Sequence, residues 1–444
     1  MATANHFCDR VTRRDALRVG SASLFGAGWG LGQLLSRQSI AAETSPPSDV
    51  SVIFLFLKGG LSTIDTWDMK PNAPSEFRGP FAPIATNIPG IEVCEHLPML
   101  AGQMDKVSLI RNFGHRNSDH GPADHYMLTG YHPIPGFNPN LSPNNQRPAH
   151  GSIISRKLGP RGSVPPYVCL PRMHASAGPA YLGASVAPFV VEADPNSPSF
   201  AVPDLLPPLV VDPGRFENRK ELLGVVDRFQ KSGEIAANRG ANAVNTFQRK
   251  AFDLMTSSAT KAAFDISAES GEMRDRYGRN SLGQACLMAR RLVEAGVRCV
   301  SIDHTNWDTH DNNFSVLKND LLPLLDRGMS TLFADLSERD MLKKTLVVVT
   351  GEFGRTPRIN QNSGRDHWGP SFTVAMGGGG IQGGRVVGKS DPRAEKPDGP
   401  AYGPEELSST MFRLLGVDPN DEFYTPEGRP VKIAASNRVI SELL

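Results

Sequence analysis

The segment 51–60 reads Ser51-Val52-Ile53-Phe54-Leu55-Phe56-Leu57-Lys58-Gly59-Gly60, a short apolar run that is closed by glycines. Such a run is typical of a central parallel strand that is buried on both faces. The residues that follow, 61–68, are polar and acidic. In open α/β sheets the loops beyond the carboxyl ends of the strands carry the chemistry. We therefore expect functional residues close to this strand end.

The same order of elements repeats toward the C-terminus. Apolar residues recur at helical spacing between 282 and 293, and Gly296 follows as a helix stop. Strands are predicted over 297–302, 345–350 and 372–376, and a helical region over about 314–337. This alternation predicts an α/β fold with a doubly wound, mostly parallel sheet and helices on both faces.

Two intervals fit this alternation less well. Residues 135–215 are rich in proline and are expected to form an extended excursion, and residues 216–280 are polar and helix-prone, which predicts a helical insertion. We expect residues 48–444 to form a single domain that includes both.

The N-terminus has the pattern of an export signal. Arg13-Arg14 precedes a Gly-rich apolar stretch over 19–35, and Ser39-Ile40-Ala41 offers small residues for cleavage. We expect residues 1–41 to be a twin-arginine signal peptide, with the twin-arginine translocase as a partner and a periplasmic or secreted location. The alternative is a retained membrane anchor, although the stretch is short for a span of ~20 residues.

Composition excludes several other classes. The formal net charge is +1 with no basic stripe, which argues against a nucleic-acid partner. No later apolar run is long enough to predict a stable membrane span. The mature part has no CxxC pair, so zinc-ribbon and redox motifs are excluded. Its cysteines are Cys94, Cys169, Cys286 and Cys299, for which disulfides would be possible outside the cytoplasm. Cys286 and Cys299 lie in apolar contexts and are expected to be buried free thiols instead.

Most histidines fall into three short windows. The first, 112–132, holds His115, His120, His125 and His132; the second holds His304, Asp308 and His310; the third is Gly364-Arg365-Asp366-His367-Trp368. Imidazole nitrogens and carboxylate oxygens bind divalent metals. Such a metal polarises an ester oxygen and lowers the pKa of bound water. The windows therefore predict a hydrolytic metal site.

Spacing constrains which residues share that site. Asp308 and His310 lie two apart, so an extended segment directs both to the same side. The spacing of five between His115, His120 and His125 needs a loop, or a loop entering a helix, for convergence. Arg355 is either an anion clamp or a buried structural ion pair. Residues 377–380, all glycine, predict a tight turn, and Trp67 and Trp368 are expected in the core.

The ordered motifs GG…DTWD, HG…MLTG, NWDTH, GEFGRTP and GRDHW, together with the arginine pair, closely resemble the exported domain-of-unknown-function 1501 family. The resemblance covers essentially the whole mature chain. It implies a divergent branch of the alkaline phosphatase and sulfatase superfamily, with an alkaline-phosphatase-like core and a metal site at the strand ends.

The resemblance to sulfatases also implies roles for single residues. His120 falls at the position of their formylglycine cysteine, so an ordinary formylglycine sulfatase is not expected. Glu352 stands for an aspartate ligand, whereas Phe353 replaces a histidine and Lys58-Gly59-Gly60 replaces an acidic pair. The remaining implied ligands are Asp303 or Asp308, with His310, and the late His367.

We therefore expect a hydrolase of phosphate or sulfate esters that uses a divalent metal, zinc, calcium or manganese. Its substrate would be a small anionic ester or a sulfated or phosphorylated polymer. Asp308, His310 and His367 would hold the metal, with Asp303, Glu352 and Asp366 as further candidates. His120 would act as nucleophile or base, and Ser118, His125 and Arg355 are further catalytic candidates. The alternatives are a non-catalytic binding or scaffold protein and a surface-anchored accessory protein of carbohydrate processing.

Overall fold

The computed structural model describes residues 49–205 and 257–444, which belong to one compact unit over 49–444. The expected signal peptide, residues 1–41, lies outside the described residues, as do residues 206–215 of the expected excursion and 216–256 of the expected helical insertion.

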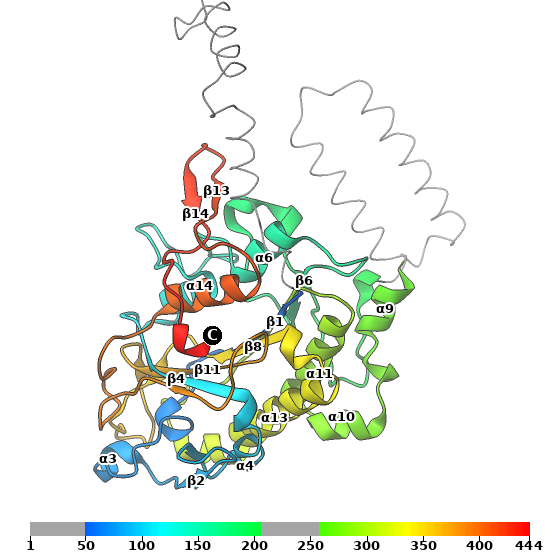
Figure 1. The fold of residues 1–444 in the computed structure, drawn as a ribbon. Coiled ribbons are helices and arrows are strands. Elements are labelled where there is room, and N and C mark those ends of the chain that lie inside the picture. The colour runs from blue at the N-terminus through cyan, green and yellow to red at the C-terminus, as the bar shows by residue number, and fades with distance from the viewer. Residues whose placement is uncertain (1–48, 206–256) are drawn as a thin grey trace, which may run out of the picture. The chain divides into compact units, whose positions relative to one another are not determined.

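A central sheet organises the described residues. Its eight strands have the order β12-β4-β11-β8-β1-β7-β5-β6. Figure 1 labels β4, β11, β8, β1 and β6 of this sheet. β11 is antiparallel to both of its neighbours, β4 and β8, and the other strands run parallel to one another. The strands are β1 Ser51–Leu57, β4 Val107–Phe113, β5 Tyr167–Leu170, β6 Phe189–Val190, β7 Cys299–His304, β8 Thr345–Thr350, β11 Phe372–Gly377 and β12 Val386–Val387.

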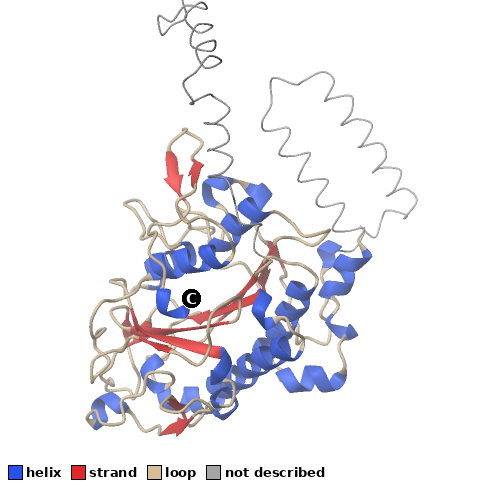
Figure 2. Cartoon of the chain, viewed as in Figure 1, coloured by secondary structure: helices blue, strands red, loops and turns tan. Residues whose placement is uncertain are grey.

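Helices cover both faces of this sheet (Figure 2). One face packs against α4 Pro98–Ala101, α9 Ser258–Phe264, α10 Gly271–Tyr277, α11 Ser281–Glu294 and α13 Leu322–Glu338. The other packs against α5 His120–Thr129, α6 His150–Leu158 and α14 Pro404–Leu414. In β1, Ile53 and Leu55 belong to the first core and Phe54 and Phe56 to the second. The predicted doubly wound α/β fold is therefore confirmed.

Short elements complete the described structure. The two-stranded pairs are β2 Pro83–Ala85 with β3 Glu92–Cys94, β9 Gly354–Arg355 with β10 His367–Trp368, and β13 Glu422–Tyr424 with β14 Pro430–Lys432. The short helices are α3 Ser75–Arg78 and α12 Asn313–Val316. A π-helical turn at Leu317–Leu321 joins α12 to α13, so the helical region expected over 314–337 is interrupted.

The direction of β11 decides where its flanking residues lie. Because β11 runs against β8, its first residue, Phe372, lies at the edge where the parallel strands end. The glycines 377–380 lie at the opposite edge, where the N–H of Gly379 donates to the carbonyl of Leu342 just before β8. The segment before β11, rather than the glycine run after it, therefore approaches the ends of β1, β7 and β8.

Residues 135–205 differ from the extended excursion that the proline content predicted. They contain α6 and two strands of the central sheet, β5 and β6. The short apolar run 167–170 supplies β5, which pairs with β7 in parallel and is buried throughout. Prolines around a strand mark its boundaries and do not exclude it.

Cys286 and Cys299 are buried free thiols, as predicted, and so are Cys94 and Cys169. Burial raises the pKa of Cys94, Cys169 and Cys286 to about 12, so these thiols stay protonated at neutral pH. Among the described residues, no helix is long and apolar enough to cross a membrane.

Candidate metal centre

The register of the central strands brings three loops together at one edge of the sheet. Leu57 of β1 lies opposite His304 of β7, and Phe56 lies opposite Thr350 of β8. The loops that follow, 58–60, 305–310 and 351–353, therefore leave the sheet side by side. They carry Asp308 and Glu352.

Two further segments reach the same edge by other routes. His367 lies in β10, opposite Arg355 of β9, and precedes the antiparallel β11. His120 is the first residue of α5, which follows β4 and has Asp119 as its N-cap. A loop entering a helix thus delivers His120, one of the arrangements that its sequence spacing required.

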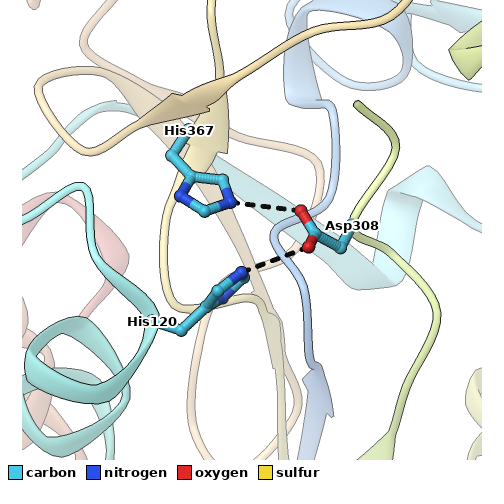
Figure 3. Close-up of side chains that lie close together, drawn as sticks. All are labelled: His120, Asp308 and His367. Carbon is cyan, nitrogen blue, oxygen red and sulfur yellow. Dashed lines mark hydrogen bonds and ion pairs between the residues drawn. The ribbon is translucent and has the colours of Figure 1, made fainter. Parts of the chain in front are cut away.

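Asp308 faces both His120 and His367, and each imidazole points toward one of its carboxylate oxygens (Figure 3). His120 Nε2 is 3.3 Å from Asp308 Oδ2, and His367 Nε2 is 3.1 Å from Asp308 Oδ1. His310 Nε2 is 3.1 Å from the same Oδ1 atom. The ligand atoms of His120, Asp308 and His367 all lie within 4.8 Å of one another. We call these four residues the Asp308 cluster.

The three imidazoles of the Asp308 cluster share one orientation. Each turns its Nδ1 atom to an oxygen and its Nε2 atom toward Asp308. The Nδ1 partners are Glu352 Oε1 at 2.5 Å from His120, Asp366 Oδ1 at 2.8 Å from His310, and the carbonyl of Ser118 at 3.0 Å from His367. An Nδ1–H that donates to oxygen fixes the tautomer and leaves the Nε2 lone pair for a metal.

This orientation brings the Nε2 atoms of two imidazoles next to each other. His310 Nε2 and His367 Nε2 lie 2.9 Å apart. Two lone pairs at this distance repel one another unless a cation, either a proton or a metal ion, lies between them. The carboxylate of Asp308 next to both nitrogens completes a donor set that suits a divalent metal. The residues therefore fit a metal ion.

Asp308 is held ionised by its surroundings. Burial alone would raise the pKa of its carboxyl, but the hydrogen bond and charge of Arg355, followed by His367 and His120, outweigh burial and lower the pKa to about 2. Arg355 Nη2 lies 2.5 Å from Asp308 Oδ1. The guanidinium is 2% exposed and also donates to the carbonyls of Gly59 and Gly60. This geometry favours the buried ion pair over an exposed anion clamp.

Glu352 holds the imidazole of His120 in its orientation through the contact with Nδ1. Its carboxylate is fully buried, and both oxygens accept the N–H of Gly59, at 2.9 and 3.0 Å. Burial raises the pKa of Glu352, whereas the hydrogen bond from His120 opposes this rise. Burial alone would lower the pKa of His120, but Glu352 and then Asp308 outweigh it and raise the pKa. The pair is therefore a histidine held by a carboxylate, as in many catalytic sites.

The glycines after β1 explain why no acidic pair stands there. A Cβ on Gly59 would lie 2.4 Å from the backbone nitrogen of Asp308, and one on Gly60 would lie 2.7 Å from the Phe353 ring. Both glycines have positive φ, 116° and 87°. The loop 58–60 thus packs directly against the loop of Asp308 and leaves no room for side chains at these positions.

Two expected site residues lie elsewhere. His125 was expected to be catalytic, but its Nδ1 contacts the carbonyl of Tyr131 and its Nε2 accepts the N–H of Gln146. Five residues at about 100° each turn it ~140° around α5 from His120. Asp303 was a candidate metal ligand, but it lies at the end of β7, where Arg172 Nε is 3.4 Å from its carboxylate. The described structure therefore does not bring His125 or Asp303 to the Asp308 cluster.

Ser118 and Asp366 lie beside the cluster. Ser118 offers its carbonyl to His367, and its hydroxyl accepts the N–H of Gly369 at 3.1 Å. Asp366 is half-exposed, and the hydrogen bond from His310 is the main cause that lowers its pKa. Both therefore orient histidines rather than face Asp308.

Sequence reasoning missed the residues that hold the loops in place. Arg365 and Asp65 form a bidentate ion pair with both side chains at 0% exposure, at 2.7 and 2.8 Å. Asn360 Nδ2 donates to the carbonyl of His310 at 2.9 Å. The DTWD and GRDHW motifs contained Asp65 and Arg365, but only opposite charges buried together in the fold identify them as partners. Trp67 is in the core, as expected, whereas Trp368, expected there too, is only half-buried.

The family described as "Protein of unknown function (DUF1501)" matches residues 49–444. No curated protein matches the chain.

Several solved structures are similar to the chain at low identity. The PsFucS1 sulfatase from Pseudoalteromonas sp. is 13% identical with a TM-score of 0.36, covering 92% of this chain and 72% of that one. The phosphonate monoester hydrolase SpPMH from Silicibacter pomeroyi is 11% identical with a TM-score of 0.38, covering 84% and 74%. The alkaline phosphatase from the Antarctic bacterium TAB5 is 12% identical with a TM-score of 0.35, covering 82% and 98%. These TM-scores are too low to say what the site does, so we infer its chemistry from its own side chains.

Proposed function

The chain belongs to the DUF1501 family of proteins of unknown function, and we propose that its Asp308 cluster is the metal centre of an exported hydrolase of phosphate or sulfate esters. The observation that carries this proposal is the shared orientation of His120, His310 and His367, whose Nε2 atoms all face Asp308.

Asp308, His310 and His367 are the proposed ligands. Their three contacts measure 2.9, 3.1 and 3.1 Å, close to the spacing of ligand atoms around one ion. Imidazole nitrogen suits zinc and manganese better than calcium, which prefers oxygen ligands. When bound, such an ion attracts an anionic ester oxygen and lowers the pKa of water.

His120 is the proposed general acid or base. Glu352 fixes its tautomer through Nδ1, so Nε2 faces the same space as the ligand atoms. The imidazole is one-third exposed, which gives a substrate access to it. A histidine in this setting moves a proton between Nε2 and the attacking or leaving oxygen.

Turnover of simple esters tests this function. The mature protein, stripped by a chelator and reloaded with zinc or manganese, is assayed with 4-nitrophenyl phosphate and 4-nitrophenyl sulfate. We expect hydrolysis that disappears on chelation and returns with metal. Metal-loaded, folded protein that hydrolyses neither ester would count against catalysis.

A metal-binding protein without catalysis is the second candidate. The observation that favours it is the inward direction of Arg355, whose guanidinium bonds to the carbonyls of Gly59 and Gly60 and to Asp308. It is then not the cation that receives a substrate anion. Metal binding without turnover of any ester would select this candidate.

Export by the twin-arginine route is proposed from Arg13-Arg14. A substitution of both arginines by lysine should leave the precursor in the cytoplasm, as measured by cell fractionation. Unchanged export of the double-lysine variant would reject this route.

A further inference from the structure

A second cleft opens at the same edge of the sheet, beside the Asp308 cluster. Its volume is about 180 Å³, and it lies between the ends of β5 and β7 and the first turns of α11. This volume equals about six water molecules in the liquid. It therefore suits one small group rather than a whole large ligand.

The cleft adjoins the metal centre along the chain. His304 lines it, and Asp308 follows four residues later on the same loop. Four residues span at most about 14 Å. His304 therefore lies within about 14 Å of Asp308, which is within the length of an extended ester whose anionic group is at Asp308.

The side chains that line the cleft include both hydrogen-bond donors and hydrogen-bond acceptors. Arg172, which is 57% exposed, contributes a guanidinium, and Asp194 and Asp303 contribute carboxylates. The Nδ1 atom of His304 accepts the indole N–H of Trp307 at 3.0 Å, so its hydrogen lies on Nε2. No described residue accepts this Nε2–H.

The charges of the lining residues limit which chemical group can bind in the cleft. Burial lowers the pKa of His304 to about 4, so its ring is neutral at neutral pH. A second anion would meet the carboxylates of Asp194 and Asp303, and the guanidinium of Arg172 is already paired with Asp303 at 3.4 Å. A hydroxyl group donates and accepts at one atom, so a neutral ring with several hydroxyls pairs with both kinds of group.

One acceptor in the cleft wall lacks a partner. Asp303 is 5% exposed, and its Oδ1 atom has no hydrogen-bond partner among the described residues. A buried carboxylate oxygen without a donor costs free energy, and Oδ2 of the same carboxylate lies 3.4 Å from Arg172 Nε.

We propose that this cleft is the subsite for the alcohol part of the ester and that this alcohol is a polyhydroxylated, sugar-like ring. The inference deepens the proposed function, since it rests on the Asp308 cluster receiving the anionic group of the same molecule.

Direct binding tests the subsite without hydrolysis. Saturation-transfer NMR is recorded with methyl glucoside, methyl galactoside and methyl fucoside on the mature protein, on Arg172→Ala and on Asp194→Asn. Arg156→Ala, an exposed arginine away from this cleft, is the matched control. We expect saturation transfer to at least one glycoside with the wild type and the control, and its loss in both cleft variants.

Kinetics then connects the subsite to the metal centre. The ratio of kcat/KM for glucose 6-phosphate to that for 4-nitrophenyl phosphate should fall roughly tenfold in Arg172→Ala, because a charged hydrogen bond to the sugar is lost. The change should appear in KM rather than kcat. An unchanged ratio would overturn the subsite.

The two proposals fail separately. If glycosides bind through Arg172 but no ester is hydrolysed, the cleft is a sugar site without a role in ester hydrolysis, and the proposed function is wrong. If esters are hydrolysed but no glycoside gives saturation transfer, or transfer persists in both cleft variants, the cleft proposal is wrong and the metal centre is untouched.

Discussion

The Nε2 atoms of His310 and His367 lie 2.9 Å apart, and Asp308 Oδ1 lies 3.1 Å from each. The two histidines come from loops that are 57 residues apart in sequence. The Nδ1 atom of His310 contacts Asp366, and the Nδ1 atom of His367 contacts the carbonyl of Ser118. The fold thus holds three ligand atoms at a separation that is favourable only around a cation.

Replacing His120 separates metal binding from catalysis. His120→Ala should keep the bound metal, because Asp308, His310 and His367 remain. It should lower kcat about 100- to 10,000-fold, the range of a general acid or base. Metal analysis and steady-state kinetics measure both effects, with the exposed His132→Ala as control. Loss of the metal in His120→Ala would instead make His120 a ligand.

The glycine at 59 is predicted to be irreplaceable. Gly59→Ala forces a Cβ against the backbone of Asp308, whereas Gly90→Ala has nothing within 4 Å although its φ is also positive, at 82°. Gly90→Ala should cost about 1–2 kcal/mol of stability through backbone strain alone. Gly59→Ala should cost more and also weaken metal binding, as measured by denaturant unfolding and by metal titration. Equal effects of both variants would contradict the close approach.

The buried pair of Asp65 and Arg365 is predicted to hold the metal loops together. Arg365→Met leaves an unpaired carboxylate in the core, which should cost about 3–5 kcal/mol. The dissociation constant of the metal should rise with it, because Arg365 is next to Asp366 and His367 in sequence. Lys389→Ala, which breaks an exposed pair with Asp398, is the control and should leave the Tm unchanged. Wild-type metal affinity in folded Arg365→Met would show that the pair does not position the ligands.

Acid should destabilise the fold through buried neutral histidines. Burial lowers the pKa of His150 from 6.5 to about 3, so the unfolded chain takes up this proton and the folded chain does not. Stability is therefore fully present above pH 6.5 and is lost as the pH falls toward 3, by at most about 1.4 kcal/mol per pH unit. His150→Gln should show a shallower loss in urea unfolding between pH 6.5 and 4.5, whereas exposed His132→Gln should not. An unchanged slope in His150→Gln would argue that His150 is charged in the fold.

The sequence predicted those parts of the fold that depend on local pattern. The apolar runs of β1 and β8 gave these strands their observed bounds, and the helical spacing around Leu282 indicated α11. The direction of β11 was not predictable, because a buried strand has the same apolar pattern in either direction. Only pairing with β8 sets it.

The same difference between local pattern and long-range contacts applies to the site. Asp308 and His310 were grouped correctly because their spacing of two is local. His125 was placed in the site with His120 because a loop was expected to bring them together, whereas both lie in α5, where five residues separate them by ~140°. The inward turn of Arg355 depends on the carbonyls of Gly59 and Gly60, nearly 300 residues away. Long-range contacts of this kind leave no local signature.

Metal content tests the central claim most directly. Full-length protein and its His367→Ala variant are purified without chelators, and their metals are measured by inductively coupled plasma mass spectrometry, with circular dichroism confirming the fold. We predict about one equivalent of zinc or manganese in the wild type, by the one-site geometry of a His/Asp centre, and its loss in folded His367→Ala. Folded wild-type protein that carries no divalent metal, and takes up none on titration with either ion, would contradict the account.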